Sequence, residues 1–191
     1  MKIVVNGTCI NGVESGAKNR FRIIYNYLIS KNSNIHFYFL EPKDFRLDQI
    51  IQKKNNVTFI KTKCLSYFSF QRYIWSILSI PKIIKYIQPD VYEQSHLPLI
   101  KIPNVKIIFT IHDIRYSIKG LNLKSFFRPS ILSNFFLIYA LRNSDKIITV
   151  SQTVKEEINK IYQNNKTEVV YNPIKFAKNN NKEIEKKSQK N

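Results

Sequence analysis

The chain has 191 residues, of which 43% are hydrophobic, and its formal net charge is +18. This length and apolar content predict one domain with a sizeable core and exclude a chain that is disordered throughout. Two cysteines are too few for a disulfide framework and favour a reducing compartment, and because the apolar runs are short we expect neither a signal peptide nor a membrane span.

The first sixty residues read as a strand, a loop and a helix, followed by two more strands. A β-branched run at residues 2–6 predicts the first strand, and the Gly-, Asn- and Ser-rich segment 7–15 predicts a loop. From Gly16, apolar residues three or four apart predict a helix. The remaining elements predicted in this part are strands at 35–40 and 57–60 and a short helix at 44–54.

The rest of the chain continues the alternation of helices and strands. A helical pattern spans residues 69–87, where Pro81 should kink or split the helix. Ser151 is placed to cap a later helix, and Pro129 is acceptable in the first turn of another. The other predicted elements are strands at 90–93, 106–111, 146–150 and 167–171 and helices at 125–141 and 152–162.

Strands that alternate with helices at this rhythm predict an α/β fold built on a doubly wound parallel sheet. We expect a single Rossmann-like domain over residues 1–174, with about six or seven strands and helices on both faces. Residues 175–191 are mostly Asn, Lys, Glu and Gln, and this composition predicts a disordered basic tail.

Polar residues follow several of these strands, and ligands of open parallel sheets bind beyond the carboxyl ends of the strands. His112 and Asp113 follow the fifth predicted strand and are the best candidates for a reactive pair. His96, Ser151 and Asn172 follow other strands and would lie along the same edge. Each has a plainer interpretation, as a loop contact for the His and Asp residues, a helix cap for Ser151 and a turn for Asn172.

Gly12 and Gly16 flank the loop after the first strand. Backbone amides in such a loop, together with the N-terminus of the following helix, can hold a phosphate group. Lys18 and Arg20 would add positive charge there, or simply face solvent. The loop matches neither the dinucleotide fingerprint nor a Walker loop, so alone it names no ligand.

Other catalytic constellations are missing from the sequence. It has no Ser-His-Asp arrangement at elbow spacing, no metal-ligand cluster and no Asp-x-Asp pair. We therefore expect no metal at the site.

The excess of basic over acidic residues, 31 against 13, bears on the choice of partner. Such a surface attracts nucleic acid, an anionic membrane or phosphorylated ligands, unless it is simply solvated. A nucleic-acid partner is supported by charge alone, because the sequence lacks nucleic-acid-binding motifs and interleaved surface aromatic residues. We therefore do not expect a nucleic-acid partner.

An ordered series of short motifs carries a resemblance to a known family. The motifs are the glycine loop at 12–20, Arg72-Tyr73-Ile74-Trp75, Leu78-Ser79-Ile80-Pro81, Gln88-Pro89-Asp90-Val91, Thr110-Ile111-His112-Asp113, the segment 143–151 and Val169-Val170-Tyr171-Asn172-Pro173. Together they resemble the N-terminal domain of the family 4 retaining glycosyltransferases, which pair two facing Rossmann-like domains in the GT-B architecture. The resemblance covers about residues 1–174.

This resemblance implies a nucleotide-sugar donor, a glycan, lipid-linked or polysaccharide-precursor acceptor, and no cofactor. It implies that the N-terminal domain mainly shapes the acceptor site, that His112 lies close to the transferred sugar and that Asp113 shapes the site. The glycine loop would approach the donor phosphates. The further substrate contacts that we expect are Gly12, Gly16, Arg20, His96, Ser151 and Asn172.

The resemblance also shows what is missing. In that family the C-terminal domain supplies an Arg/Lys pair for the pyrophosphate and a Glu-x7-Glu motif, but no two acidic residues of this sequence stand eight apart. Three explanations stay open: the partner half is a separate polypeptide, the gene is truncated to a relic, or the domain binds an acceptor without transferring anything.

We therefore predict a glycosyltransferase-like domain that transfers a sugar only when a C-terminal donor-binding half completes it. The alternative is a non-catalytic Rossmann-like module that binds a glycan or a phosphorylated ligand. We expect the protein in the cytoplasm, with a role in polysaccharide biosynthesis for the cell envelope. Its basic surface would bind the anionic inner face of the membrane as a peripheral protein.

Overall fold

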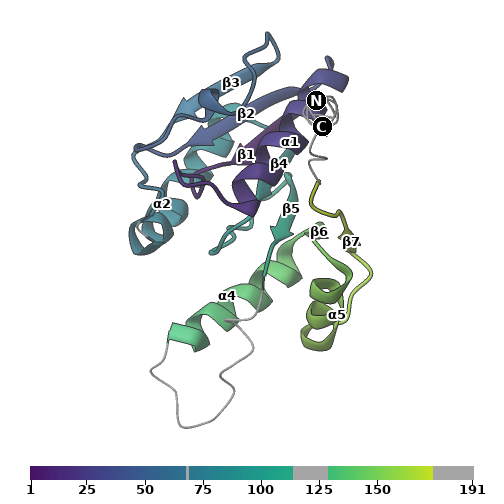
Figure 1. Cartoon of the computed structure of the whole chain (residues 1–191). Coiled ribbons are helices and arrows are strands. Elements are labelled where there is room, and N and C mark those ends of the chain that lie inside the picture. Colours follow the sequence, from purple (N-terminus) through teal and green to yellow (C-terminus); the bar gives the residue numbers. More distant parts are fainter. Residues whose placement is uncertain (68, 114–128, 174–191) are drawn as a thin grey trace, which may run out of the picture.

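The computed structural model describes residues 1–67, 69–113 and 129–173 (Figure 1). Strands and helices alternate along this part of the chain, as expected. In chain order the elements are β1 (Lys2–Asn6), α1 (Gly16–Lys31), β2 (His36–Glu41), the 3-10 turn η1 (Leu47–Gln49), β3 (Val57–Lys61), α2 (Ser69–Ile87), β4 (Val91–Gln94), β5 (Lys106–Ile111), α4 (Pro129–Asn143), β6 (Lys146–Thr149), α5 (Gln152–Ile161) and β7 (Thr167–Val169).

The seven strands form one parallel sheet in the order β3-β2-β1-β4-β5-β6-β7. β1 lies in the interior of the sheet, where Asn6 pairs with Leu40 of β2 on one side and with Gln94 of β4 on the other. The prediction of a doubly wound α/β fold with six or seven strands is therefore confirmed.

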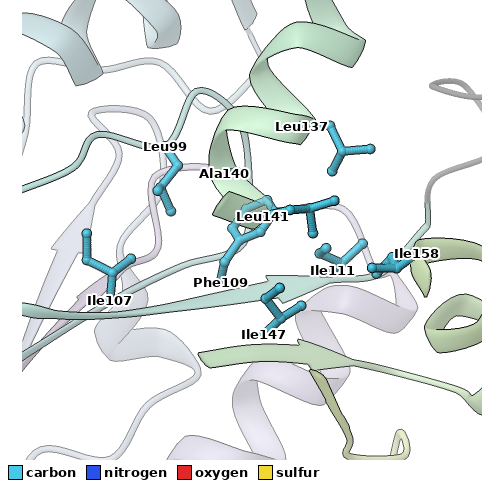
Figure 2. Close-up of a cluster of buried hydrophobic side chains, with 9 residues drawn as sticks. All are labelled: Leu99, Ile107, Phe109, Ile111, Leu137, Ala140, Leu141, Ile147 and Ile158. Atoms are coloured by element: carbon cyan, nitrogen blue, oxygen red, sulfur yellow. The ribbon is translucent and has the colours of Figure 1, made fainter. Parts of the chain in front are cut away.

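Helices cover both faces of this sheet. On one face, Tyr25 and Ile29 of α1 pack with Val5 of β1 and Phe37 of β2. On the other face, Ile80 and the rest of the inner side of α2 pack on β1 and β4. Helices α4 and α5 continue this second layer over β5 and β6, with a core made of Leu99, Ile107, Phe109, Ile111, Leu137, Ala140, Leu141, Ile147 and Ile158 (Figure 2).

The helix predicted at residues 44–54 is wrong, because only the 3-10 turn η1 forms there. The backbone amide of Leu47 donates to Glu41 Oε2 at 3.1 Å, and the carboxylate of Asp44 accepts hydrogen bonds from the backbone and hydroxyl of Ser66. Glu41 and Ser66 lie outside the segment, and their hydrogen bonds with it compete with those that a helix would form.

The helix predicted at residues 69–87 forms and is not split by proline, since α2 continues through Pro81. This residue lies on the outer side of the helix, next to exposed Lys82. Water can reach the carbonyl group that proline leaves without a donor there.

Two further expectations concern segments that lie partly or wholly outside the described residues. Helix α4 begins at Pro129, which confirms its place in the first turn, whereas residues 125–128 of the predicted helix lie outside the described part. The tail predicted to be disordered, 175–191, also lies outside it. Among the described helices, none is long and apolar enough to cross a membrane.

Candidate functional site

The direction of winding reverses between β1 and β4. The chain leaves β1 towards β2 on one side and later returns as β4 on the other side. In open parallel sheets a ligand crevice lies at this reversal, beyond the carboxyl ends of the strands. The loop after β1 and the segment after β4 both begin here, and His112 follows the neighbouring strand β5.

A cavity of about 690 Å³ lies at this point, between α1 and the sheet. Its size falls in the range of small-molecule sites. Apolar side chains of α1, β1 and β5 form much of its wall. The polar and charged residues that matter for its chemistry are Arg20, Glu93, Ser95, His96, Thr110 and His112.

The structure thus brings three of the predicted site residues together, because Arg20, His96 and His112 all line this cavity. Their elements are α1, the segment after β4 and the end of β5. The other five do not line it: Gly12, Gly16, Asp113, Ser151 and Asn172.

A second hollow, of about 1190 Å³, lies at the opposite edge of the sheet. It lies between the C-terminal part of α2 and residues 102–106, at the amino-terminal ends of the strands, and it has no histidine in its lining. Of the strand-end residues predicted from the sequence, His96 and His112 therefore belong to the smaller cavity.

Arg20 is a buried cation in the wall of the cavity, with a side chain that is only 6% exposed. Its Nη1 donates hydrogen bonds to the carbonyl oxygens of Val170, at 2.7 Å, and Tyr171, at 3.1 Å. Burial lowers the pKa of Arg20, while the negative charge of Glu93 opposes that change. Since guanidinium remains charged in proteins, the site contains a fixed positive charge.

Glu93 is a site residue that the sequence reasoning missed. It lies in β4, and its Oε1 accepts a hydrogen bond from Thr110 Oγ1 at 2.9 Å while its Oε2 accepts one from the hydroxyl of Tyr25. The pKa of Glu93 is raised, because the effect of burial exceeds the lowering effects of these two hydrogen bonds and of the charge of Arg20. The sequence signal for Glu93 was a carboxyl group in a strand next to the switch point. Its hydrogen-bond partners, Tyr25 and Thr110, are distant in the sequence and give no local pattern.

His112 lies where β5 ends and forms part of the cavity wall. Burial, and then the positive charge of Arg20, lower its pKa. The imidazole is therefore neutral at pH 7, so it can donate one hydrogen bond and accept another. Asp113 follows on the exposed side of the chain and does not line the cavity.

His96 is also neutral, because burial and the nearby charge of Arg72 lower its pKa to about 3. Its Nε2 lies 3.5 Å from Thr8 Oγ1, in the loop after β1. Thr8 is itself held by Asn6, whose Oδ1 accepts its hydroxyl hydrogen bond at 2.7 Å. The Nδ1 atom of His96 is buried and has no hydrogen-bond partner among the described residues.

The glycine loop has open space around both predicted glycines. A Cβ atom on Gly16 would meet nothing within 4 Å, and one on Gly12 would meet only Phe45, at 3.9 Å. Ser15 caps α1, with its Oγ accepting from the backbone amide of Lys18 at 3.1 Å. The side chain of Lys18 donates to the carbonyl of Gly12 and pairs with Glu14, so the loop is held in shape by its own contacts.

Ser151 and Asn172 have other surroundings. The hydroxyl of Ser151 accepts a hydrogen bond from the backbone amide of Val154 at 3.2 Å and caps α5, which is the plainer of its two interpretations. Asn172 is exposed and follows Tyr171, whose carbonyl bonds Arg20. Among the described residues there is also no group of three or more His, Cys, Asp or Glu side chains that could hold a metal ion.

A doubly wound parallel sheet with a polar cavity at its switch point defines a Rossmann-like ligand-binding domain. The sequence profile described as Glycosyltransferase Family 4 matches residues 15–178, so the chain belongs to that family and is an N-terminal domain of its type. A comparison with curated proteins found no match.

A solved structure shows the same fold. The chain is similar to a glycosyltransferase from Rickettsia africae ESF-5, with a TM-score of 0.56 and 18% sequence identity over 99% of this chain and 48% of that one. It therefore spans about half the length of that protein. A more distant likeness, with a TM-score of 0.44 and 13% identity over 78% of this chain and 54% of the other, is to the Bordetella bronchiseptica enzyme WbmH in complex with NAD+.

Proposed function

We propose that this chain is the acceptor-side half of a glycosyltransferase that moves a sugar from a nucleotide-sugar donor to a glycan, lipid-linked or polysaccharide-precursor acceptor. The observation that carries the proposal is the cavity at the switch point, where His112, His96 and Arg20 meet. Transfer requires a donor-binding C-terminal half, on the same polypeptide or on another one.

In this proposal His112 lies beside the transferred sugar. A neutral imidazole can hydrogen-bond the sugar hydroxyls and support the positive charge that develops at the reacting carbon, as polar groups placed in advance do in other active sites. Burial and the charge of Arg20 keep the ring neutral at pH 7 by lowering its pKa. His96 lines the same cavity and forms part of the wall against which the acceptor would lie.

The glycine loop and the strand-end residues have supporting roles in the proposal. Gly12 and Gly16 admit the donor phosphates, because the space around them is open, and Asp113 shapes the entrance of the site. The hydroxyl of Ser151 already caps a helix and Asn172 is exposed, so we assign them to the rim of the cleft that the second half would close.

The wider setting is also part of the proposal. We place the reaction in the cytoplasm, in polysaccharide biosynthesis for the cell envelope. We expect transfer to need no metal, because the sequence lacks the Asp-x-Asp pair of metal-dependent sugar-nucleotide sites. Full turnover in the presence of EDTA is the expected result.

The test combines the chain with the donor-binding half encoded in the same or the adjacent reading frame. Release of nucleoside diphosphate and transfer of the sugar are measured with a panel of nucleotide-linked sugars. We expect turnover only in the mixture, and a loss of about 100-fold or more when His112→Ala is introduced, since an active-site donor typically contributes that much.

The matched control is His36→Ala. His36 is a histidine of β2 that bonds Thr58 at 2.9 Å and does not line the cavity, so turnover should stay at the wild-type level. Full turnover in the His112→Ala mixture would remove the role of His112. If ligands bound to the mixture without any turnover, the chain would be the non-catalytic module instead.

A further inference from the structure

Helices α2 and α4 present large hydrophobic side chains to solvent. On α2 the exposed fractions are 69% for Phe70, 45% for Ile74, 50% for Ile77 and 60% for Leu78. On α4, Phe135 is 63% exposed and Tyr139 is 37% exposed. We call the six residues Phe70, Ile74, Ile77, Leu78, Phe135 and Tyr139 the apolar patch.

The two halves of the apolar patch lie on neighbouring helices. Phe70, Ile74 and Ile77 are spaced four and three residues apart, so they lie along one side of α2. Tyr73 lies next to them on the side that faces α4, where its ring is 5.5 Å from the ring of Phe136. The ring of Phe136 is in turn 5.8 Å from that of Phe135, so aromatic contacts join the two helices.

These residues are not needed for the core of the domain. The opposite side of α2 already packs on the sheet through Ile80, Ile84 and Ile87. The inner side of α4 packs on β5 and β6 through Leu137 and Leu141 (Figure 2). Exposed apolar side chains gathered on neighbouring helices whose inner faces are already filled mark an interaction site.

The charges around the patch select the kind of partner. Helices α2 and α4 contain no acidic residue, but they carry Lys82, Lys85 and Arg142, all exposed, and Arg72. In the whole chain 31 basic residues face 13 acidic ones. Apolar side chains flanked by Lys and Arg suit a bilayer interface, where the apolar groups enter the acyl region and the cations meet anionic headgroups.

We propose that the apolar patch on α2 and α4 is a docking surface for an anionic phospholipid bilayer. The mode is peripheral, with the two helices lying on the membrane surface. Membrane binding depends on both parts of the surface. The apolar side chains are buried in the acyl region, and the flanking cations are attracted to the anionic headgroups.

One charged residue of α2 acts on a residue of the candidate site. Arg72 stands two residues before Ile74 on α2 and is close enough to His96 for its charge to lower the pKa of that ring. The cavity itself lies on the other face of the sheet, between α1 and the strands, and no described residue of α2 lines it. If the proposed function holds, docking keeps the domain at the membrane, where a lipid-linked acceptor would be found; the docking itself does not depend on that function.

The test is co-sedimentation of the full chain with vesicles of phosphatidylcholine alone and of phosphatidylcholine mixed with phosphatidylglycerol. We expect binding to the mixed vesicles, weakened by added salt. The double variant Ile74→Ser/Ile77→Ser should lower the binding constant by at least about tenfold, because two isoleucines no longer enter the bilayer. The double variant Lys82→Gln/Lys85→Gln should lower it by about tenfold on anionic vesicles only.

The matched control is Tyr27→Ser, which removes a side chain that is 61% exposed on α1, a helix on the other face of the sheet. It should bind as the wild type does. Trp75, the only tryptophan, packs against the core on α2, so its unchanged fluorescence in each variant shows that α2 has stayed folded.

Three results would overturn the proposal. The first is equal sedimentation of the wild type with both kinds of vesicle, or with neither. The second is an equal loss in the Tyr27→Ser control. The third is a wild-type dimer that dissociates in the Ile74→Ser/Ile77→Ser variant, since the patch would then bind a second copy of this chain. None of these measurements involves sugar transfer, so they leave the proposed function untouched.

Discussion

The Nη1 atom of Arg20 lies 2.7 Å from the carbonyl oxygen of Val170, which is 150 residues further along the chain. Arg20 belongs to the first helix and Val170 directly follows the last strand, β7. Both residues line the cavity that also contains His112. One buried cation therefore joins the two ends of the domain at the candidate site.

Replacing this cation should destabilise the domain. We expect Arg20→Met to lower the free energy of unfolding by about 2–3 kcal/mol, because the carbonyl groups of Val170 and Tyr171 lose a charged donor. Urea denaturation followed by circular dichroism measures the change. The control is Arg22→Met, which removes a hydrogen bond to Asn19 within the same helix and should stay within about 0.5 kcal/mol of the wild type. Equal losses of stability in the two variants would contradict the conclusion that Arg20 stabilises the domain by joining its two ends.

The lowered pKa of His96 predicts sensitivity to acid. The ring is neutral in the folded state down to its pKa of about 3, but in the unfolded chain it takes up a proton near the usual value of 6.5. Its contribution to stability is therefore complete above pH 6.5 and is lost as the pH falls towards 3. The loss approaches about 1.4 kcal/mol per pH unit in this range.

The measurement is the free energy of unfolding of the wild type and of His96→Gln between pH 7 and pH 5. We expect the advantage of the wild type over this variant to shrink by about 2 kcal/mol over that interval. A constant difference between the wild type and His96→Gln would show that His96 is free to protonate in the folded chain.

The glycines at the two ends of the segment between β1 and α1, Gly7 and Gly16, should respond differently to alanine. A Cβ atom on Gly7 would lie 2.6 Å from Leu47 Cδ1 and 3.2 Å from the carbonyl oxygen of Leu40. We expect Gly7→Ala to lower the free energy of unfolding by about 1–3 kcal/mol through overpacking. Gly16→Ala has open space and lies in the first turn of α1, so it should be neutral or stabilise by up to about 1 kcal/mol. Thermal and urea unfolding of both variants checks this, and comparable losses would refute the argument from space.

The elements of the fold could be predicted because their signals are local. Apolar runs and three-to-four spacing lie within each segment, and all seven strands appear within a few residues of the predicted places. Segment 44–54 failed for a reason outside itself: Glu41 and Ser66, which compete for its hydrogen bonds, lie beyond its ends.

The candidate site was predicted only in part, because some of its contacts come from residues far away in the sequence. His112 and His96 stand after strands, and this place is visible in the sequence. Glu93 was missed because its importance depends on Tyr25, 68 residues before it, and on Thr110, 17 residues after it. The tight packing around Gly7, which does not line the cavity, was also not predicted, because the atoms that crowd it come from Leu47 and Leu40.

The sequence by itself determined the alternation of strands and helices, the parallel α/β class, the excess of positive charge and the resemblance to a family. These depend on the order and spacing of residues that are close together in the chain. Only the tertiary structure decided that Arg20, Glu93, His96 and His112 share one cavity. It also decided that the outer side of α2 is apolar and uncovered. Strand order and register bring together side chains up to 150 residues apart, and no local pattern specifies which of them meet.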